Sequence, residues 1–303
     1  MTELAEIFQQ VPAAWVAVVF ILSLLVGSFL NVVIHRVPVM LEREWRAQAE
    51  QILQPDSHAK PAAQAKYNLV VPRSACPKCG AQITAAQNIP VISYLLLKGK
   101  CAKCAAKISA RYPVVELGTA ILSAVVAWKF GFVWYTAAAL LLTWMLIALT
   151  GIDIDHQLLP DNMTLPLVWI GLLLSLAATL PSIGLPVDPR SSIIGAIAGY
   201  LSLWSVYHAF RLLTGKEGMG YGDFKLFAAL GAWLGWQMLL PIILLAAFTG
   251  AVIGILMIAL RGRDRNIPIP FGPYLAAAGW IALLWGDDIV SSYLHFAGVS
   301  SPQ

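Results

Sequence analysis

Charged residues are scarce in this chain. Only 12% of its 303 residues are Asp, Glu, Lys or Arg, whereas soluble domains usually carry about 25%. Hydrophobic residues make up 59% of the sequence, and the mean hydropathy is +0.73. The composition therefore excludes a soluble globular protein and predicts a polytopic membrane protein.

Other features are missing as well, and each absence excludes a further class of protein or segment. No basic patch is interleaved with aromatic residues, so the formal net charge of +4 does not indicate nucleic-acid binding. No repeat is visible at the spacing of solenoid units or transporter halves. The first apolar stretch has no basic segment before it and no A-x-A-like cleavage site, so we expect a retained helix rather than a signal peptide.

Apolar stretches of the length needed to cross a bilayer recur along the chain. A helical crossing takes about 20 residues. Pro241 separates two of the stretches, because together they are too long for one crossing. The sequence predicts an all-α polytopic membrane protein with about eight transmembrane helices, near residues 13–34, 114–131, 134–152, 164–180, 191–211, 224–239, 241–260 and 271–291.

The basic residues are distributed unevenly between the two predicted sides of the membrane. Of the 20 Lys and Arg residues, 18 fall on one side, and only Lys129 and Arg190 fall on the other. Twelve of the 18 lie within residues 36–111. Because cytoplasmic loops collect Lys and Arg, this side is predicted to be cytoplasmic, and both chain termini are predicted to lie outside the cytoplasm.

Three regions follow from this polarity. Residues 1–34 are expected to contain the first transmembrane helix, residues 35–112 a cytoplasmic zinc-binding segment, and residues 113–303 a helical membrane core with short loops. Within the cytoplasmic segment, the charged stretch 42–68 is expected to begin as a short surface helix that Pro55 ends.

All four cysteines lie in the cytoplasmic segment, as two C-x-x-C pairs separated by 21 residues. Cytosolic thiols stay reduced, so a disulfide framework is not expected. Two such pairs match a closed four-thiolate zinc site, which leaves no coordination position open and is therefore structural. A dithiol redox pair is the alternative, but the βαβ pattern that it needs is absent. The predicted zinc ligands are Cys76, Cys79, Cys101 and Cys104.

Two aspartates stand at the predicted cytoplasmic boundary. Asp153 ends the third apolar stretch and Asp223 begins the sixth, so a helical bundle can bring them together at one depth. Two carboxyl groups that share one proton supply a general base and a proton donor, the minimum for water-mediated peptide hydrolysis. Such a pair titrates as a unit, so the sequence assigns neither role to either residue.

Gly220 and Gly222 precede Asp223 in the stretch GMGYGD. Glycine can take backbone angles that are closed to other residues. These two glycines are expected to admit an extended substrate, or to let the loop close over it.

Structural roles compete with catalysis at the acidic residues. Asp223 at a helix start is also favoured by the helix dipole. Asp155 lies two residues from Asp153 and therefore off its helical face. Asp161, just after a proline, is typical of a helix N-cap.

Five segments resemble the type IV prepilin peptidases, a family of bifunctional leader peptidase/N-methyltransferases among the GxGD membrane aspartic proteases. They occur in order through most of the chain, which is far more specific than a GxGD motif alone. The segments are GSFLNVVIHRVP (27–38), the stretch from CPKCG to RYPVVEL (76–117), IDIDHQLLPD (152–161), GMGYGDFKL (218–226) and PFGPYL (270–275).

The resemblance implies that Asp153 and Asp223 are the two catalytic aspartates. It implies cleavage of type IV prepilin and type II secretion pseudopilin leaders after a glycine, at the cytoplasmic face of the bacterial inner membrane. The expected partners are these substrates and membrane lipid, with no nucleic acid.

The resemblance also implies that S-adenosylmethionine methylates the freed N-terminal residue, usually phenylalanine. No glycine-rich nucleotide fingerprint follows a predicted strand, so the residues themselves do not indicate where this cofactor binds. Gly99 and Lys100 are the candidates, and a simple turn after the stretch YLLL is an equal alternative for them.

Two further functions stay open. A transporter can use two such aspartates as ion-coupling carboxylates, but transporter sites usually lie near the bilayer midplane within repeated halves. A peptidase without methylation, similar to the preflagellin-type GxGD proteases, is the other. The large four-cysteine segment argues against it, because those enzymes resemble only the protease core.

Overall fold

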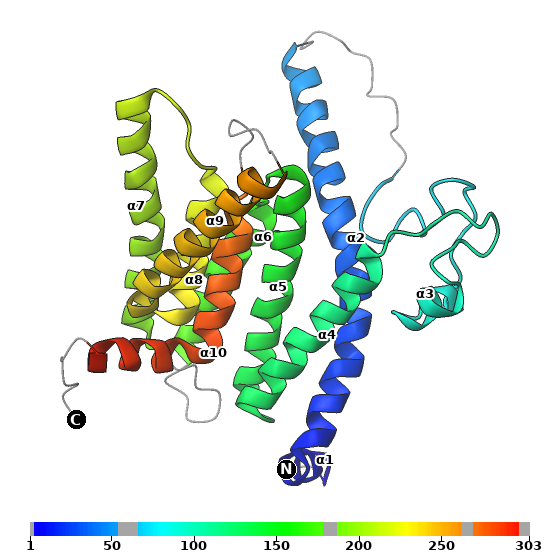
Figure 1. The fold of residues 1–303 in the computed structure, drawn as a ribbon, viewed down its shortest axis with the longest axis horizontal. Helices are drawn as coiled ribbons and strands as arrows, with labels where there is room; N and C mark the ends of the chain where they lie inside the picture. Colours follow the sequence, from blue (N-terminus) through cyan, green and yellow to red (C-terminus); the bar gives the residue numbers. More distant parts are fainter. Residues whose placement is uncertain (1–2, 54–65, 178–186, 262–268, 297–303) are drawn as a thin grey trace. The chain divides into compact units, whose positions relative to one another are not determined.

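The computed structural model describes residues 3–53, 66–177, 187–261 and 269–296, and the chain divides into two compact units, Met1–Trp128 and Lys129–Gln303. The described residues form helices and no strands, apart from two isolated β-bridges, so the all-α prediction is confirmed (Figure 1). The α-helices are α1 (Glu3–Gln10), α2 (Pro12–Leu53), α3 (Ile92–Leu96), α4 (Arg111–Phe130), α5 (Trp134–His156), α6 (Asp161–Ala177), α7 (Pro189–Thr214), α8 (Tyr221–Leu234), α9 (Leu239–Arg261) and α10 (Gly272–Phe296).

Five of the described helices are long and apolar enough to cross a membrane: α2, α4, α5, α7 and α9 with the turn before it. The protein is therefore a multi-pass membrane protein. The other three predicted spans fall on shorter or bent helices. Helix α6 has 17 residues, α8 has 14, and α10 departs from helical geometry at Trp285 (φ −133°, ψ 15°). The count of eight crossings stays a prediction.

Helix α2 is much longer than the predicted first span. Its 42 residues extend about 63 Å at 1.5 Å per residue, roughly twice the thickness of the hydrocarbon core. The predicted boundary at residue 34 therefore falls inside a continuous helix, and the expected surface helix is its continuation. Charged residues after Leu41 keep the helix going, with an i,i+4 pair between Glu42 and Arg46. Pro55, the expected end of that helix, lies outside the described residues.

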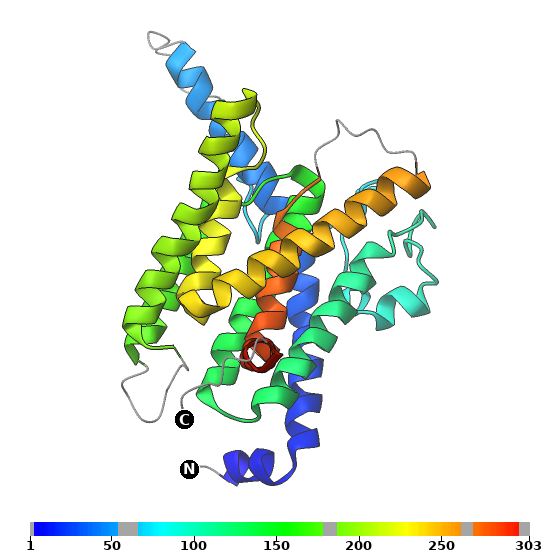
Figure 2. The ribbon, with the colours of Figure 1, turned by 60° about the vertical axis from the view of Figure 1, so that its left-hand side comes forward.

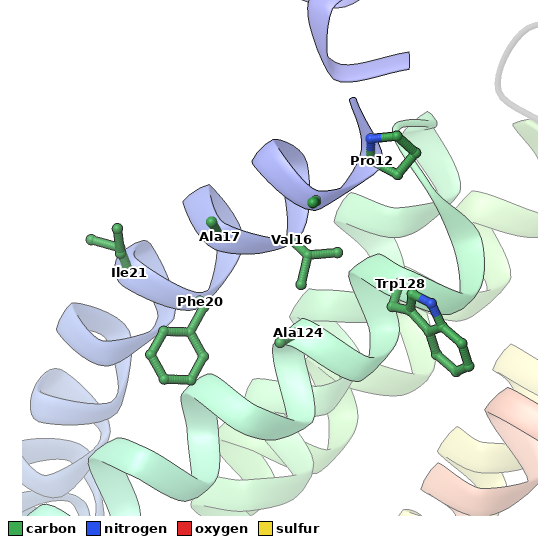
Figure 3. A pocket seen from close by; sticks show the side chains of 8 residues that line it. Pro12, Val16, Ala17, Phe20, Ile21, Ala124 and Trp128 are labelled. Atoms are coloured by element: carbon green, nitrogen blue, oxygen red, sulfur yellow. The ribbon is translucent and has the colours of Figure 1, made fainter. Parts of the chain in front are cut away.

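In the first unit, α2 and α4 pack closely at a glycine. A Cβ atom on Gly27 would lie 2.7 Å from the Cα atom of Glu116, so a larger residue would force the helices apart. Toward the start of α2, the two helices flank an open apolar groove (Figure 3). Its lining is hydrophobic throughout, as a surface in contact with hydrocarbon requires, and consists of Pro12, Ala13, Val16, Ala17, Phe20, Ile21, Ala124 and Trp128.

In the second unit, α8 is the core helix. Every residue of α8 from Leu226 to Leu234 is buried, and α8 runs alongside α7 in both views (Figures 1 and 2). Two glycines of α7 make this approach possible. A Cβ atom on Gly199 would lie 2.7 Å from the carbonyl oxygen of Phe227, and one on Gly195 would collide with the carbonyl oxygen of Gly231. Small residues four apart allow this kind of helix contact in membranes.

We expect Gly195→Leu to destabilise the second unit strongly. The added side chain would meet backbone rather than a movable side chain, so the cost should reach or exceed the about 1–3 kcal/mol typical of overpacking. Thermal unfolding of the purified protein in detergent measures the effect. Gly118→Leu on α4 is the matched control, because a Cβ atom there meets nothing within 4 Å. Equal unfolding midpoints for the two variants would contradict the packing argument.

Candidate functional site

The second unit brings Asp153 and Asp223 together. Asp153 lies in the last turn of α5 and is 5% exposed, and Asp223 lies in the first turn of α8 and is 6% exposed. Their carboxyl groups are close enough to interact electrostatically. Asp155, two residues after Asp153, is exposed. The two acids that the sequence pairs are thus the two that the fold buries side by side.

Within the part of the chain that the structure describes, each of the two carboxyl groups keeps one oxygen without a hydrogen-bond partner. Asp223 Oδ2 accepts a hydrogen bond from the backbone N–H of Gly220 (3.3 Å), which caps α8. The backbone N–H of Gly272, at the start of α10, faces the Asp153 carboxyl group. Asp223 Oδ1 and Asp153 Oδ2 are buried and make no hydrogen bond among the described residues. Because buried polar atoms are normally paired, these two oxygens make this a candidate site for a polar ligand or water.

Leu159, in the loop between α5 and α6, packs against glycines beside both acids. A Cβ atom on Gly222 would lie 2.6 Å from Leu159 Cβ, and one on Gly272 would lie 3.2 Å from Leu159 Cδ1. The Gly272 position would also lie 2.6 Å from Asp153 Oδ2. Only glycine fits at either position while Leu159 and the carboxyl group stay where they are.

Gly220 and Gly222 do not use backbone angles that are closed to other residues in this structure. Neither glycine is among the described residues with positive φ, and Gly220 has an ordinary extended geometry (φ −85°, ψ 152°). Gly222 lacks a side chain because Leu159 fills that space, and Gly220 offers its N–H to Asp223. A direct contact of these glycines with substrate stays a prediction.

Three residues of this site, Leu159, Lys225 and Gly272, had no role predicted from the sequence. Gly272 lies in PFGPYL and Leu159 in LLPD, and only their contacts indicate a purpose. Lys225 pairs with Asp161, with 2.5 Å between Nζ and Oδ1. Asp161 is the first residue of α6, one position after the N-cap that was predicted for it, because the carbonyl of Pro160 accepts the first hydrogen bonds of the helix. Its side chain joins α6 to α8. A lysine two residues after the GxGD aspartate is a charge that needs a partner in an apolar segment, but the spacing of the sequence does not identify Asp161 as that partner.

The four cysteines of the first unit converge as predicted. Their sulfur atoms all lie within 4.8 Å of one another, and Cys76 Sγ lies 3.8 Å from Cys104 Sγ. Four thiolates at about 2.3 Å from a zinc ion in a tetrahedron are about 3.8 Å apart. The donor set and its spacing therefore fit a tetrahedral metal ion.

Two equivalent backbone turns present the cysteines. In the first, the N–H of Gly80 donates to the carbonyl of Cys76. In the second, the N–H of Ala105 donates to the carbonyl of Cys101, both at 2.9 Å. Gly80 and Ala105 take left-handed angles (φ 68° and 54°). Hydrogen bonds from the backbone N–H groups of Cys104 and then Lys103 lower the pKa of the Cys101 thiol to about 6, which favours the thiolate that binds metal.

Gly99 and Lys100 form part of the turn before the second cysteine pair. Gly99 has φ 67°, and a Cβ atom there would lie 2.9 Å from the hydroxyl oxygen of Tyr94. Lys100 makes a β-bridge with Lys107. These contacts account for a glycine at position 99 structurally, and cofactor binding at either residue stays a prediction.

Arg36 and Glu116 hold the cysteine segment to the helices of its unit. The buried guanidinium of Arg36 donates to the carbonyl oxygens of Asn68 (2.8 Å) and Pro72 (2.6 Å). The backbone N–H of Val91 donates to Glu116 Oε2 (2.7 Å), and Val91 has φ 60°, which is unusual for a β-branched residue. Both charged side chains thus have structural partners.

Comparison with known proteins places this bundle with its paired aspartates among membrane proteases. A family model described as the Type IV leader peptidase family matches residues 140–255, and one described as the Bacterial Peptidase A24 N-terminal domain matches residues 21–130. The chain belongs to the prepilin leader peptidase/N-methyltransferase family.

Relatives of that name cover almost the whole chain. The chain is 56% identical to a prepilin leader peptidase/N-methyltransferase of Pseudomonas aeruginosa over 95% of this chain and 96% of the relative. It is 58% identical to one of Aeromonas salmonicida, over 97% and 99%, and 51% identical to one of Dichelobacter nodosus, over 90% and 93%. No solved structure matches the chain significantly.

Proposed function

We propose that this protein is an aspartic endopeptidase that removes the leader from prepilins and pseudopilins, and then methylates the new N-terminus. The observation that supports the peptidase is the pair of buried carboxyl groups, Asp153 and Asp223, each with one unpaired oxygen. Relatives that carry both activities in their names match over nearly the full chain.

The two carboxyl groups divide the work of hydrolysis. Two negative charges in one buried site repel, so the pair holds one proton between them at neutral pH. The ionised carboxylate accepts a proton from a water molecule, whose oxygen attacks the carbonyl carbon of the scissile peptide bond. The protonated carboxyl donates to the carbonyl oxygen. The amide nitrogen then leaves with a proton, and a free N-terminal amine results.

Cleavage occurs at the cytoplasmic face of the bacterial inner membrane, after a glycine of the leader. Asp153 lies in the last turn of one helix and Asp223 in the first turn of another, and the charge pattern of the sequence supports a cytoplasmic position for both helix ends. A membrane-anchored substrate with its leader in the cytoplasm reaches that face directly.

The four-cysteine cluster binds a structural zinc ion. Cys76, Cys79, Cys101 and Cys104 would hold it, and four protein ligands leave no position for substrate or water. The ion would tie the two backbone turns together in a segment too small to form a large hydrophobic core.

S-adenosylmethionine supplies the methyl group for the second reaction. The family names support this activity, and the new amine must lose its proton before it can accept a methyl group. The cysteine segment of the first unit, with Gly99 and Lys100, is the proposed location because it is the sizeable part of the chain outside the apolar helices.

We expect the purified protein to convert a prepilin, in the presence of S-adenosylmethionine, to a product that lacks the leader and carries one added methyl group. Mass spectrometry of the product's N-terminus measures both steps at once. A product without the leader and without the methyl group would limit the protein to the peptidase. Intact prepilin under these conditions would contradict the proposed function.

A further inference from the structure

Asp161 and Lys225 form an ion pair at the end of the loop between α5 and α6, the loop that contains Leu159. Lys225 Nζ lies 2.5 Å from Asp161 Oδ1. Asp161 follows Leu159 by two residues, and Lys225 follows Asp223 by two residues. The pair therefore ties the end of this loop to the first turns of α8.

This ion pair differs from the other ion pairs described in the same unit. The Lys225 side chain is 22% exposed and that of Asp161 is 59% exposed, with 2.5 Å between the charged atoms. The Lys129–Asp288 and Arg211–Glu217 pairs are longer, at 3.4 and 3.8 Å, and their basic side chains are more exposed, at 33% and 53%. Exposed pairs contribute only about 0–1 kcal/mol, because water competes with them and both side chains move. The short distance and the largely enclosed lysine favour one defined position of α8 relative to the start of α6, even though the Asp161 side chain is reached by water.

The placement of Lys225 also needs an explanation. A positive charge near the N-terminus of a helix is disfavoured by the helix dipole, and Lys225 lies in the second turn of α8. Asp161 stands at the N-terminus of α6, where a negative charge is favoured. The ion pair therefore stabilises Lys225 near a helix N-terminus that disfavours its charge, and the partner Asp161 lies at a helix N-terminus that favours a negative charge.

We propose that the Asp161–Lys225 pair positions the two catalytic carboxyl groups, a role that rests on the proposed peptidase function. The pair holds the loop so that Leu159 stays between Gly222 and Gly272, the glycines beside the two acids. Neither Asp161 nor Lys225 touches the reacting atoms, so both are positioning residues.

Loss of the pair lets the loop move away from α8. Leu159 then no longer sets the distance between the start of α8 and the start of α10, and the two carboxyl groups no longer face one water molecule in the same geometry. A misplacement of about 1 Å in an active site can lower the rate about 100-fold. Substrate binding depends on other surfaces and should change little.

Kinetics of leader cleavage test this role with Asp161→Asn and Lys225→Met, which remove one charge each at nearly constant size. We expect kcat to fall by roughly 10- to 100-fold in each variant, with KM changed by less than about twofold. The double variant should be no slower than the slower single variant, since both substitutions break one interaction. Lys225→Arg should keep most of the activity because it keeps the pair.

Arg211→Met and Glu217→Gln are the matched controls, because they break an exposed ion pair of the same unit. We expect both to retain kcat within about twofold. Losses that add up in the double variant, or an unchanged kcat with a lower unfolding midpoint, would overturn the positioning role.

Hydrogen exchange of the backbone amides at residues 157–159 and 221–225 gives a second readout that needs no substrate. Exchange should become about tenfold faster in Asp161→Asn and Lys225→Met, and stay unchanged in the two controls. If the unmutated protein leaves prepilin intact, the proposed peptidase function is contradicted. Unchanged exchange in a parent that does cleave prepilin defeats the positioning role alone.

Discussion

Asp153→Asn and Asp223→Asn are each expected to abolish leader cleavage and to leave the protein folded. Each substitution removes one of the two groups that handle protons in the reaction, and general acid–base catalysis contributes roughly 10²–10⁴-fold per group. We therefore expect kcat to fall by about 10³-fold or more in either variant. Asparagine has nearly the same shape, so the packing of α5, α8 and the start of α10 should persist.

The same substitutions should raise thermal stability. Both acids are buried with one oxygen unpaired, so the parent protein keeps a charge in a site that solvates it poorly. Removing either acid removes that cost and the repulsion between the two groups. The unfolding midpoint in detergent should therefore rise while cleavage disappears, the pattern expected of groups kept for catalysis rather than for the fold.

Asp155→Asn is the matched control for this prediction. It lies on the same helix, two residues from Asp153, and it is exposed. We expect its kcat to stay within about twofold of the parent, because an exposed carboxyl group outside the pair handles no proton in the reaction. Normal cleavage by either Asp153→Asn or Asp223→Asn would show that the pair is not catalytic.

Replacing Cys101 by serine is expected to release the bound metal and unfold the cysteine segment. Binding of structural zinc contributes about 10–16 kcal/mol in small zinc domains, and this free energy is part of their folding free energy. Three thiolates cannot complete the tetrahedral site. Metal analysis of the purified variant measures the loss of zinc, and limited proteolysis at residues 66–110 measures the loss of structure.

Leader cleavage by Cys101→Ser should persist, because both carboxyl groups belong to the other compact unit. Methylation should be lost if the cysteine segment carries the second activity. Treating the parent with a strong chelator should reproduce the result without a mutation. A parent protein purified without zinc, with four freely titrating thiols, would refute the zinc site.

Much of the candidate site could be predicted because its residue types are rare in their surroundings. Ionised side chains are costly near hydrocarbon, so Asp153 and Asp223 stand out in an apolar sequence, and paired C-x-x-C motifs need no tertiary information to indicate a metal. The uneven distribution of Lys and Arg among the loops likewise predicted how the helices are oriented in the membrane.

The local reasons were harder to predict. The change from apolar to charged residues after position 34 was expected to mark a helix end, but α2 continues because both halves are good helix formers. The prediction for Gly222 concerned its backbone freedom, and nothing in the sequence indicated that this position also leaves space for Leu159. In both cases the residue type was informative, and the physical cause lay in a contact that the local sequence does not contain.

The sequence by itself determined the class of the protein, because hydropathy, charge asymmetry and rare residue types act locally and additively along a chain. It determined the all-helical membrane architecture and singled out the four cysteines and the two acids that the structure brings together. The tertiary structure alone decided which acid is buried and which is exposed, why Gly272 and Leu159 lie beside the pair, and that Asp161 reaches Lys225. These are contacts between helices distant in sequence, and they depend on how the helices cross, which no local pattern specifies.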